Sequence, residues 1–495
     1  MTADKIFSTL ESNRVEELDD LLTQLKPLIL SHIAESEKPK ASLGSRLPPR
    51  DLQEKIPLET PIKGYGKDGV YELFETILQN SVVTWHPGFL DKLYAGTNPI
   101  GVISDLLLSL LNTNSHVYTV SPLVTMIEKK VSKEYAALFG FHGKYAGGLT
   151  FSGGSWSNIT SLHVARSMLH PETKTDGNTD KKFAIFTSKH SHYSVEKAAI
   201  LLGMGSKSVW KVEVDVSGCM NVNDLESKIL QSIKEGFTPL YVNSTAGTTV
   251  LGSFDPLEQI SEVSKRYKLW HHVDGSWGGN AVFSTKYKYK LQGSHLADSI
   301  TSNPHKLLGV PATCSFLLLP DERVFQTANS LSAPYLFHNV QEQEDTFYDL
   351  ADGTMGCGRR PDSLKLYLGW YYYGSQGYEE RINHAFDIAG YFADKVSQNK
   401  KQFKLVSSNP PPALQVCFFF NKDGQFEDGA VNTNTTREIV AKLHQSGRFL
   451  IDYSPAHGVE GGEFFRVVFN SPIVNSDLAD ELYSAIIQIG NTLDA

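Results

Sequence analysis

The sequence predicts an α/β protein built on a mostly parallel sheet with helices on both faces. From about Thr150 onward, short apolar stretches alternate with segments of helical period. The predicted strands are KKFAIFTS, TPLYVNS, LWHHVDG, SITSN and SFLLLP. Helices are predicted over 193–202, 221–236 and 256–268. Alternation of this length indicates parallel strands joined by helical crossovers, and such sheets bind ligands beyond the carboxyl ends of their strands.

Two further regions flank this core, so we expect divisions at 1–112, 113–368 and 369–495. The first region begins with a helix whose apolar face is formed by Val15, Leu18, Leu22, Leu25 and Ile29. Pro27 is expected to kink this helix. Its apolar face packs either in the core of the chain or across a partner subunit. After about Trp370, mixed helices and strands such as LQVCFFF predict a smaller α+β domain.

Composition excludes several classes of protein. The 495 residues carry a net charge of -9, with 41% hydrophobic and 20% charged residues, which is typical of a soluble globular chain without a nucleic-acid-binding surface. The four cysteines form no CxxC pair, so neither a zinc site nor a disulfide framework is expected. The start lacks the pattern of a secretory signal, and the longest apolar runs fall short of the roughly 20 residues of a membrane span. We therefore expect a cytoplasmic protein with no membrane partner and no metal.

Four polar residues follow the predicted strands. They are His192, Thr245, Asp274 and Lys306. A lysine amine forms Schiff bases with carbonyls, most readily where burial lowers its pKa. A strand-end carboxylate needs a cationic partner, and an imidazole can stack on a flat ring or carry protons. Taken one at a time, such a lysine is more often solvated or structural, and such a histidine more often bonds the backbone at a helix start. The aspartate is equally explained as the cap of the next turn.

A glycine turn precedes the first of these residues. Gly153 and Gly154 follow a strand-like LTF and lead into a helical segment. Glycines allow close approach of the backbone, and a helix N-terminus offers free N–H groups, so this place suits a phosphate. A Gly-Gly pair on its own is more often a simple turn. The order of turn, histidine, aspartate and lysine within one α/β unit is the stronger signal.

At this point the motifs resemble a known family. FSGGSWSN, SHYS, VNSTAGTTVLGSFDP, HVDGSWGG and SITSNPHKLLGV are similar to the acidic amino acid branch of the decarboxylases that depend on pyridoxal phosphate (PLP). This branch includes glutamate decarboxylase and relatives acting on cysteine sulfinate and aspartate. The similarity runs from about Trp85 to the end of the chain. It implies the PLP-dependent transferase fold (fold type I), a PLP cofactor, α-decarboxylation of an acidic L-amino acid, and a homodimer with residues of both chains lining each site.

The resemblance also implies a role for each matched residue. Lys306 would hold PLP through a Schiff base, Asp274 would pair with its pyridine nitrogen, and His192 would stack on its ring. Thr245 and Ser276 would lie near the cofactor. The residues implied at its phosphate are Ser155, Ser157, Asn158, Asn303 and His305.

Two further matches concern the substrate. APYLFHN is similar to the family's mobile loop, which makes Tyr335 the residue that protonates the substrate carbon after carbon dioxide leaves. GGEFFRVVFNSP matches the motif whose arginine grips the substrate carboxylate, so Arg466 takes that role. Lys306, Tyr335 and His192 are thus the expected catalytic residues.

The chain departs from the family pattern at the substrate pocket. Asp-Ala-Ala is common where this chain has Asp274, Gly275 and Ser276, and His116 replaces a usual aromatic residue. Lys92 and Tyr94 stand where glutamate decarboxylases commonly have a glutamine and a serine. The lysine adds attraction for an anionic side chain and the tyrosine takes up volume. We therefore expect substrate contacts from Lys92, Tyr94 and His116, and a preference for an acid shorter than glutamate.

Two alternatives remain at this stage. The same fold supports PLP-dependent aminotransferases and carbon-carbon lyases, since fold does not determine reaction. A PLP-binding protein without turnover, acting as a regulatory or interaction module, is the other. The presence of Tyr335 favours the decarboxylase over the first, and the complete set of expected catalytic residues speaks against the second.

Overall fold

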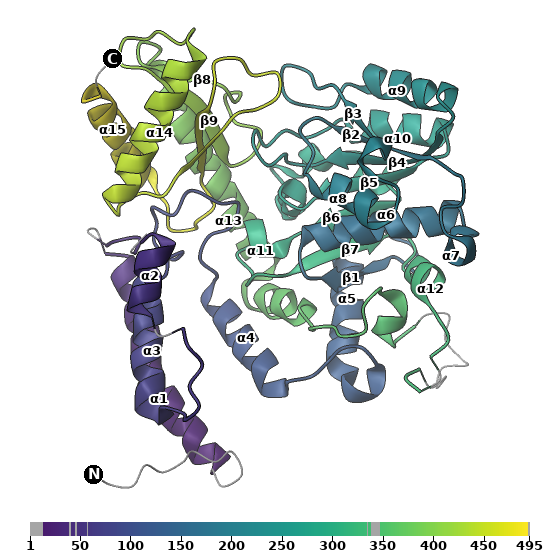
Figure 1. Ribbon diagram of the computed structural model, residues 1–495, viewed down its shortest axis with the longest axis horizontal. Coiled ribbons are helices and arrows are strands. Elements are labelled where there is room, and N and C mark those ends of the chain that lie inside the picture. Colours follow the sequence, from purple (N-terminus) through teal and green to yellow (C-terminus); the bar gives the residue numbers. More distant parts are fainter. Residues whose placement is uncertain are drawn as a thin grey trace.

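Two lobes, each built on one β-sheet, make up the chain (Figure 1). The computed structural model describes residues 13–493 except 39–40, 45–46, 57, 334 and 338–346. The larger lobe contains a seven-stranded sheet in the order β1-β7-β6-β5-β4-β2-β3. Its strands are β1 (Gly147–Phe151), β2 (Phe183–Ser188), β3 (Val209–Val212), β4 (Thr238–Thr245), β5 (Trp270–Gly275), β6 (Ser299–Ser302) and β7 (Ser315–Leu319).

Most neighbouring strands of this sheet are parallel, which confirms the predicted α/β class. The run from β3 through β2, β4 and β5 to β6 is parallel throughout. Strand β7 instead runs antiparallel to both β6 and β1. The segment 303–314 between β6 and β7 contains only a four-residue helix, α11 (Pro304–Leu307). A parallel connection needs a longer crossover, so the chain turns back here.

Helices cover the large sheet. Helix α6 contacts strands β4 to β7, while α9 and α10 pack against β4 and its neighbours. The predicted helical segments all occur, with ends that differ by a few residues. The helices of this lobe are α5 (Pro122–Leu138), α6 (Gly154–Leu169), α7 (Thr173–Asp176), α8 (Ser194–Leu201), α9 (Val222–Lys234), α10 (Leu257–Arg266) and α12 (Arg323–Asn329).

The smaller lobe holds an antiparallel sheet in the order β10-β11-β9-β8. Phenylalanines of β9 and β11 fill its core, and Phe418 and Phe465 stack with ring centroids 5.1 Å apart. Helix α14 contacts strands β9 to β11, and helix α15 packs against α14 (Figure 1). The elements are β8 (Phe403–Leu405), β9 (Gln415–Phe420), β10 (Asp452–Ser454), β11 (Phe464–Val468), α14 (Gly429–Gln445) and α15 (Ser476–Asn491).

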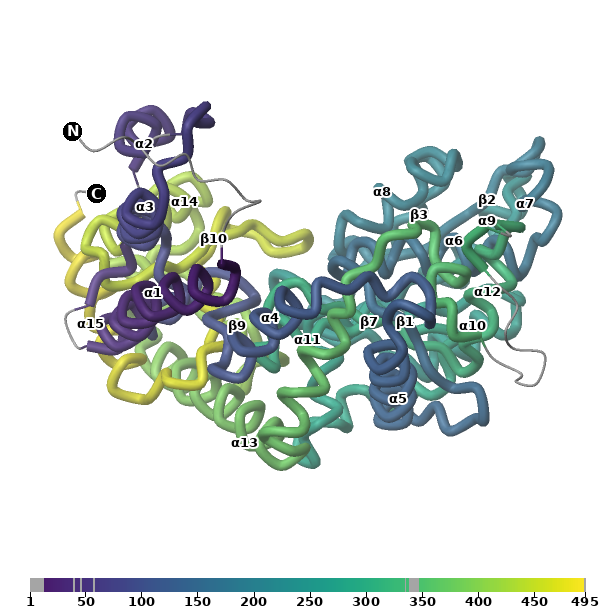
Figure 2. The backbone as a smooth tube through the Cα atoms, turned by 90° about the horizontal axis from the view of Figure 1, so that it is seen from below, coloured from purple at the N-terminus to yellow at the C-terminus, as the bar shows by residue number. Residues whose placement is uncertain are grey.

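One long helix joins the lobes. Helix α13 (Ser363–Gln398) contacts α5 in the larger lobe and β8, β9 and α15 in the smaller one (Figure 2). It is kinked at Gly374, whose φ of 67° is in the left-handed region that glycine tolerates. The division expected after residue 368 therefore falls within a helix, because periodicity alone does not show that one helix serves two cores.

The N-terminal region forms a separate helical layer. Helices α1 (Arg14–Ser36) and α3 (Gly66–Asn80) lie side by side, with α2 (Pro49–Lys55) at one end and α4 (Pro99–Leu111) leading to the larger lobe (Figure 1). Helix α1 continues through Pro27 rather than ending there. Pro27 is exposed, so water can satisfy the carbonyl that its ring leaves without a partner. Within the described ranges, no helix combines the length and apolarity needed to cross a membrane.

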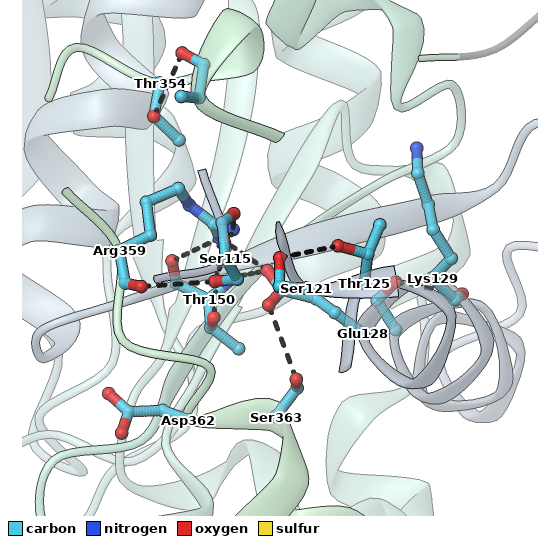
Figure 3. A network of polar contacts seen from close by, with 12 residues as sticks. Ser115, Ser121, Thr125, Glu128, Lys129, Thr150, Thr354, Arg359, Asp362 and Ser363 are labelled. Atoms are coloured by element: carbon cyan, nitrogen blue, oxygen red, sulfur yellow. Dashed lines mark hydrogen bonds and ion pairs between the residues drawn. The ribbon is translucent and has the colours of Figure 1, made fainter. Parts of the chain in front are cut away.

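A buried ion pair fastens the start of α13 to the large sheet (Figure 3). Glu128 of α5 is fully buried, and Arg359 donates to its Oε1 over 2.5 Å. The same oxygen accepts from the Thr150 N–H of β1, and Ser363 donates to the other oxygen. Arg359 also donates to the carbonyl of Ser115. Each charge thus has several partners, which is the condition for burying it without a large cost.

Replacing Arg359 by methionine should lower the free energy of unfolding by about 3–5 kcal/mol, because Glu128 would keep its charge without a partner. Chemical denaturation followed by tryptophan fluorescence measures this. The matched control is Arg360→Met, which removes a half-exposed guanidinium paired with Asp105 and should cost less than about 1 kcal/mol. Equal losses for the two variants would contradict the importance of the buried pair.

Candidate active site

The carboxyl ends of three neighbouring strands bring polar side chains together. In the parallel register, Thr245 of β4 lies opposite Asp274 of β5, and Asp274 lies opposite Thr301 of β6. Lys306 follows β6 directly, within α11. The hydroxyl oxygens of Thr245 and Thr301 are buried without a hydrogen-bond partner in the described structure. The strand-end grouping predicted from the sequence therefore occurs, and it leaves two unsatisfied hydroxyl groups in the site.

Asp274 is a buried carboxylate held by hydrogen bonds. Asn158 Nδ2 donates to its Oδ2 over 2.8 Å, and the Ser276 N–H donates to its Oδ1 over 3.0 Å. Burial opposes ionisation, but the neighbouring His192 and these hydrogen bonds outweigh it and hold the pKa of Asp274 below its usual value. Among the described residues no lysine or arginine forms an ion pair with Asp274. A ligand cation in this position would complete its environment.

Lys306 and His192 share this electrostatic environment. Burial lowers the pKa of the Lys306 amine, while the charge of Asp274 acts in the opposite direction. The pKa of His192 is also lowered, chiefly by burial. The positive charge of Lys306 adds to this effect, and the negative charge of Asp274 opposes it. The Ser194 N–H donates to His192 Nδ1 over 3.3 Å, which fixes one side of the ring. The three residues therefore lie within electrostatic reach of one another, and burial shifts the Lys306 amine toward its neutral form.

The first turn of α6 forms the opposite end of the site. Gly153 has a φ of 108°, and no side chain caps the helix that begins at Gly154. A Cβ atom on Gly154 would lie 2.4 Å from Ser276 Oγ and 2.9 Å from Asn303 Nδ2, so glycine is required by this close packing. Ser155 follows, half-buried in the same turn. Free backbone N–H groups at a helix start beside hydroxyl and amide groups suit an anion such as a phosphate.

Three residues expected near the phosphate have other contacts. Ser157 lies 2.8 Å from the Ser315 hydroxyl, in the interior of the lobe. Asn158 bonds to Asp274, at the other end of the site. His305 interacts through Nδ1 with the backbone of Cys314, and burial lowers its pKa to about 4. Their order in the motif did not reveal this, because successive helix positions face different directions.

A side chain that the sequence argument missed holds the backbone of Lys306. Asn470, just after β11, donates through Nδ2 to the carbonyl oxygens of Lys306 (3.0 Å) and Leu93 (2.9 Å). Arg381 of α13 donates to the carbonyls of Leu307 and Asn470. The smaller lobe is thereby bonded to the residues around Lys306. No local sequence pattern signals such a contact, since it joins segments far apart in the chain.

The predicted substrate residues Arg466 and Lys92 come together with two acids. Arg466 of β11 is 7% exposed and donates to Asp452 over 2.8 Å. Lys92 Nζ lies 3.1 Å from the same Asp452 oxygen and 3.0 Å from Asp91. Arg466 also donates to the carbonyl of Thr249, in the turn after β4. The structure thus adds two carboxylates to the predicted pair of cations.

The remaining predicted residues lie further out. Tyr94 is 43% exposed, and its ring centroid is 5.8 Å from that of Phe89. His116 is half-buried, with Nδ1 3.0 Å from the Asn114 carbonyl oxygen. Tyr335 is 84% exposed. These three are not bonded to Lys306 or Asp274 in the described part of the chain.

The site fits PLP in its chemistry. A buried amine with a lowered pKa could bind the aldehyde, and the buried Asp274 lacks the cation that a pyridine N–H would supply. His192 offers a ring, the Thr245 hydroxyl lacks a partner, and the start of α6 can accept a phosphate. Together with the sheet order, these features define the class of fold type I PLP enzymes.

Comparison with known proteins identifies a family within this class. A family profile described as the pyridoxal-dependent decarboxylase conserved domain matches residues 49–421. The chain is 47% identical over 477 residues to an L-aspartate decarboxylase of Metarhizium robertsii, covering 92% of this chain and 94% of that protein. It is 36% identical to a glutamate decarboxylase-like protein of Gibberella zeae, with the same coverage.

Solved structures of similar proteins have the same fold. The crystal structure of mouse CSAD in apo form superposes with a TM-score of 0.89 at 32% identity, covering 96% of this chain and 99% of that one. Oryza sativa TDC with PLP and tryptamine gives a TM-score of 0.88 over 98% and 99% of the two chains, and at 21% identity this likeness shows the fold alone. The chain belongs to the pyridoxal-dependent decarboxylase family, and it is a PLP-dependent carboxy-lyase that acts on an amino acid.

Truncating Asn470 to alanine should lower the free energy of unfolding by about 2 kcal/mol, because two buried carbonyl groups lose a donor. Thermal and chemical denaturation of the PLP-loaded protein measure this. Asn223→Ala on the exposed face of α9 is the control and should leave the midpoint nearly unchanged. An Asn470→Ala protein as stable as the control would show that these bonds contribute nothing.

Proposed function

We propose that the protein removes the α-carboxyl group of a short acidic L-amino acid, with aspartate or cysteine sulfinate preferred to glutamate. The observation that carries this is the grouping of Lys306, Asp274 and His192 at the carboxyl edge of the sheet. The link from Asn470 to the carbonyls of both Lys306 and Leu93, the residue after Lys92, supports a part for the cationic side chains of Lys92 and Arg466. The names of the relatives support the acidic substrate, since they include an L-aspartate decarboxylase, a glutamate decarboxylase-like protein and mouse CSAD.

Each residue has a distinct part in this proposal. Bound PLP supplies an electron-withdrawing ring that accepts the electron pair left by departing carbon dioxide. Lys306 binds the cofactor through its amine, whose lowered pKa favours the neutral, nucleophilic form. The ionised Asp274 accepts the N–H of the pyridine ring and keeps that ring cationic. His192 covers one face of the ring and excludes water from it.

Arg466 and Tyr335 act on the substrate itself. Arg466 binds a substrate carboxylate and orients the bond that breaks, from a position fixed by its bond to the carbonyl of Thr249. Tyr335 then donates its phenolic proton to the substrate carbon. Ser155, Ser276 and Asn303 hold the phosphate end of the cofactor with the first turn of α6. Thr245 contacts the cofactor through its unpartnered hydroxyl group.

The active unit is proposed to be a homodimer with residues of both chains at each site. Apolar side chains are exposed on several N-terminal helices, which favours their burial against a second copy. Tyr335 is 84% exposed, so it is available to a site outside its own lobe. The apolar residues include Val15, Leu18 and Leu22 of α1, Leu73 and Ile77 of α3, and Ile103, Leu106 and Leu110 of α4.

Incubating the PLP-loaded protein in parallel with L-aspartate, L-cysteine sulfinate and L-glutamate tests the proposed function. Carbon dioxide and the matching amine should form from the two shorter acids several times faster than from glutamate, because Tyr94 takes up volume in the pocket. Lys306→Ala should lose both the activity and the visible absorbance of the bound cofactor. No carbon dioxide from any of the acids would refute the function, and equal rates would refute the size preference.

Replacing Tyr335 by phenylalanine should lower amine formation by about 10²- to 10⁴-fold and raise the share of carbonyl products, because the proton then reaches the wrong carbon. Chromatography of amine and carbonyl products measures the ratio. Tyr289→Phe, which alters another exposed tyrosine of the larger lobe, should leave the ratio unchanged. An unchanged ratio in Tyr335→Phe would assign the proton donor elsewhere.

A further inference from the structure

Four charged side chains form a cluster between the lobes. Asp452 of β10 and Arg466 of β11 are register partners in the small sheet, and their side chains meet at 2.8 Å. Lys92 reaches the same Asp452 oxygen over 3.1 Å and Asp91 over 3.0 Å. One carboxylate therefore pairs with both of the cations to which substrate binding has been assigned.

The cluster is joined to the active site through the turn after β4. Arg466 donates through Nη1 to the carbonyl of Thr249, and Gln415 donates to the carbonyls of Thr248 and Thr249. The same turn follows Thr245 of the strand-end group. Arg466 is thus bonded to the turn that follows a strand-end residue of the site, and its pairing with Asp452 bears directly on what it can bind.

Asp452 carries a charge in this position. Burial acts to raise its pKa, but Arg466 and Lys92 outweigh this and hold the pKa below its usual value. Asp452 is therefore ionised near neutral pH. Burial raises the pKa of the neighbouring Asp91, so Asp452 is the carboxylate that offsets the charge of both cations. An approaching substrate carboxylate then meets a cluster without the excess positive charge that two cations alone would offer.

We propose that Asp452 is a specificity-determining residue that occupies the place of a substrate carboxylate on Arg466 and Lys92, so that an acidic substrate binds by competing with it. This rests on the proposed function in taking Arg466 as the carboxylate-binding residue. In the free enzyme Asp452 supplies a counter-ion to a guanidinium that is 7% exposed. A substrate carboxylate can replace Asp452 as the counter-ion of Arg466, whereas a neutral side chain cannot. The Asp452–Arg466 ion pair therefore stays intact when a neutral amino acid approaches.

The test is calorimetric titration of the PLP-loaded protein with succinate, which carries two carboxylates and is not turned over. Asp452→Asn keeps the shape of the side chain and removes its charge, so the Kd for succinate should fall about tenfold. Asp387→Asn, which neutralises an exposed aspartate paired with Lys286, should bind succinate as the unaltered protein does. Asp452→Ser removes the charge with a smaller side chain and should also tighten binding.

A Kd that is unchanged or larger in both Asp452 variants would overturn the proposal and leave Asp452 as a residue that only positions Arg466. Titration with 1,4-diaminobutane tests whether Asp452 binds a ligand cation instead. If Asp452→Asn weakens the binding of this diamine and leaves succinate unaffected, Asp452 is a site for a ligand ammonium group and the proposal fails. These titrations do not depend on turnover. The proposal for Asp452 can therefore fail while decarboxylation of the acids is observed, and it can hold while no decarboxylation is observed.

Discussion

The buried, ionised carboxylate of Asp274 constrains the arrangement of the whole site. A charge without solvent needs partners, and here they come from three separate elements: Asn158 from α6, the N–H of Ser276 after β5, and His192 after β2. Bringing these elements to one point orients α6 so that its unobstructed first turn lies at the same edge of the sheet. The carboxylate still lacks a formal cationic partner among the described side chains. In a family whose cofactor carries a pyridine nitrogen, the proposed partner of this carboxylate is the N–H of that ring.

Much of the large lobe could be predicted because burial leaves a local trace in the sequence. The fully buried strands β2 and β7 appear as apolar runs, and the amphipathic helices of this lobe show their own period. Parallel strands also end at one edge, so the amino-acid order alone was enough to group Thr245, Asp274 and Lys306. The direction of β7 could not be predicted, since strand periodicity carries no polarity. The sequence also could not predict that α13 packs against both lobes, because this packing depends on the residues around the helix.

Long-range pairing accounts for most of what the sequence argument missed. Lys92 was interpreted as a free attraction for an anionic substrate, yet it has two carboxylates as neighbours, one of them 360 positions away. Asn158 was placed at the phosphate from its position in a motif, while the fold directs it to Asp274. A motif indicates which residues lie near a ligand. Only the three-dimensional structure shows which end of the ligand each residue faces. The expected roles of Arg466 and Tyr335 stay predictions for the same reason.

The bond between Asn470 and the carbonyl of Lys306 has a consequence for how the enzyme is made. Its two ends are 164 positions apart, and the later one lies in the last tenth of the chain. During synthesis, every strand of the large sheet leaves the ribosome long before Asn470, whose side chain bonds to the Lys306 segment. A nascent or prematurely terminated chain can therefore form the sheet while its lysine segment is not yet braced. The C-terminal lobe must therefore be synthesised before the Lys306 segment gains this bond.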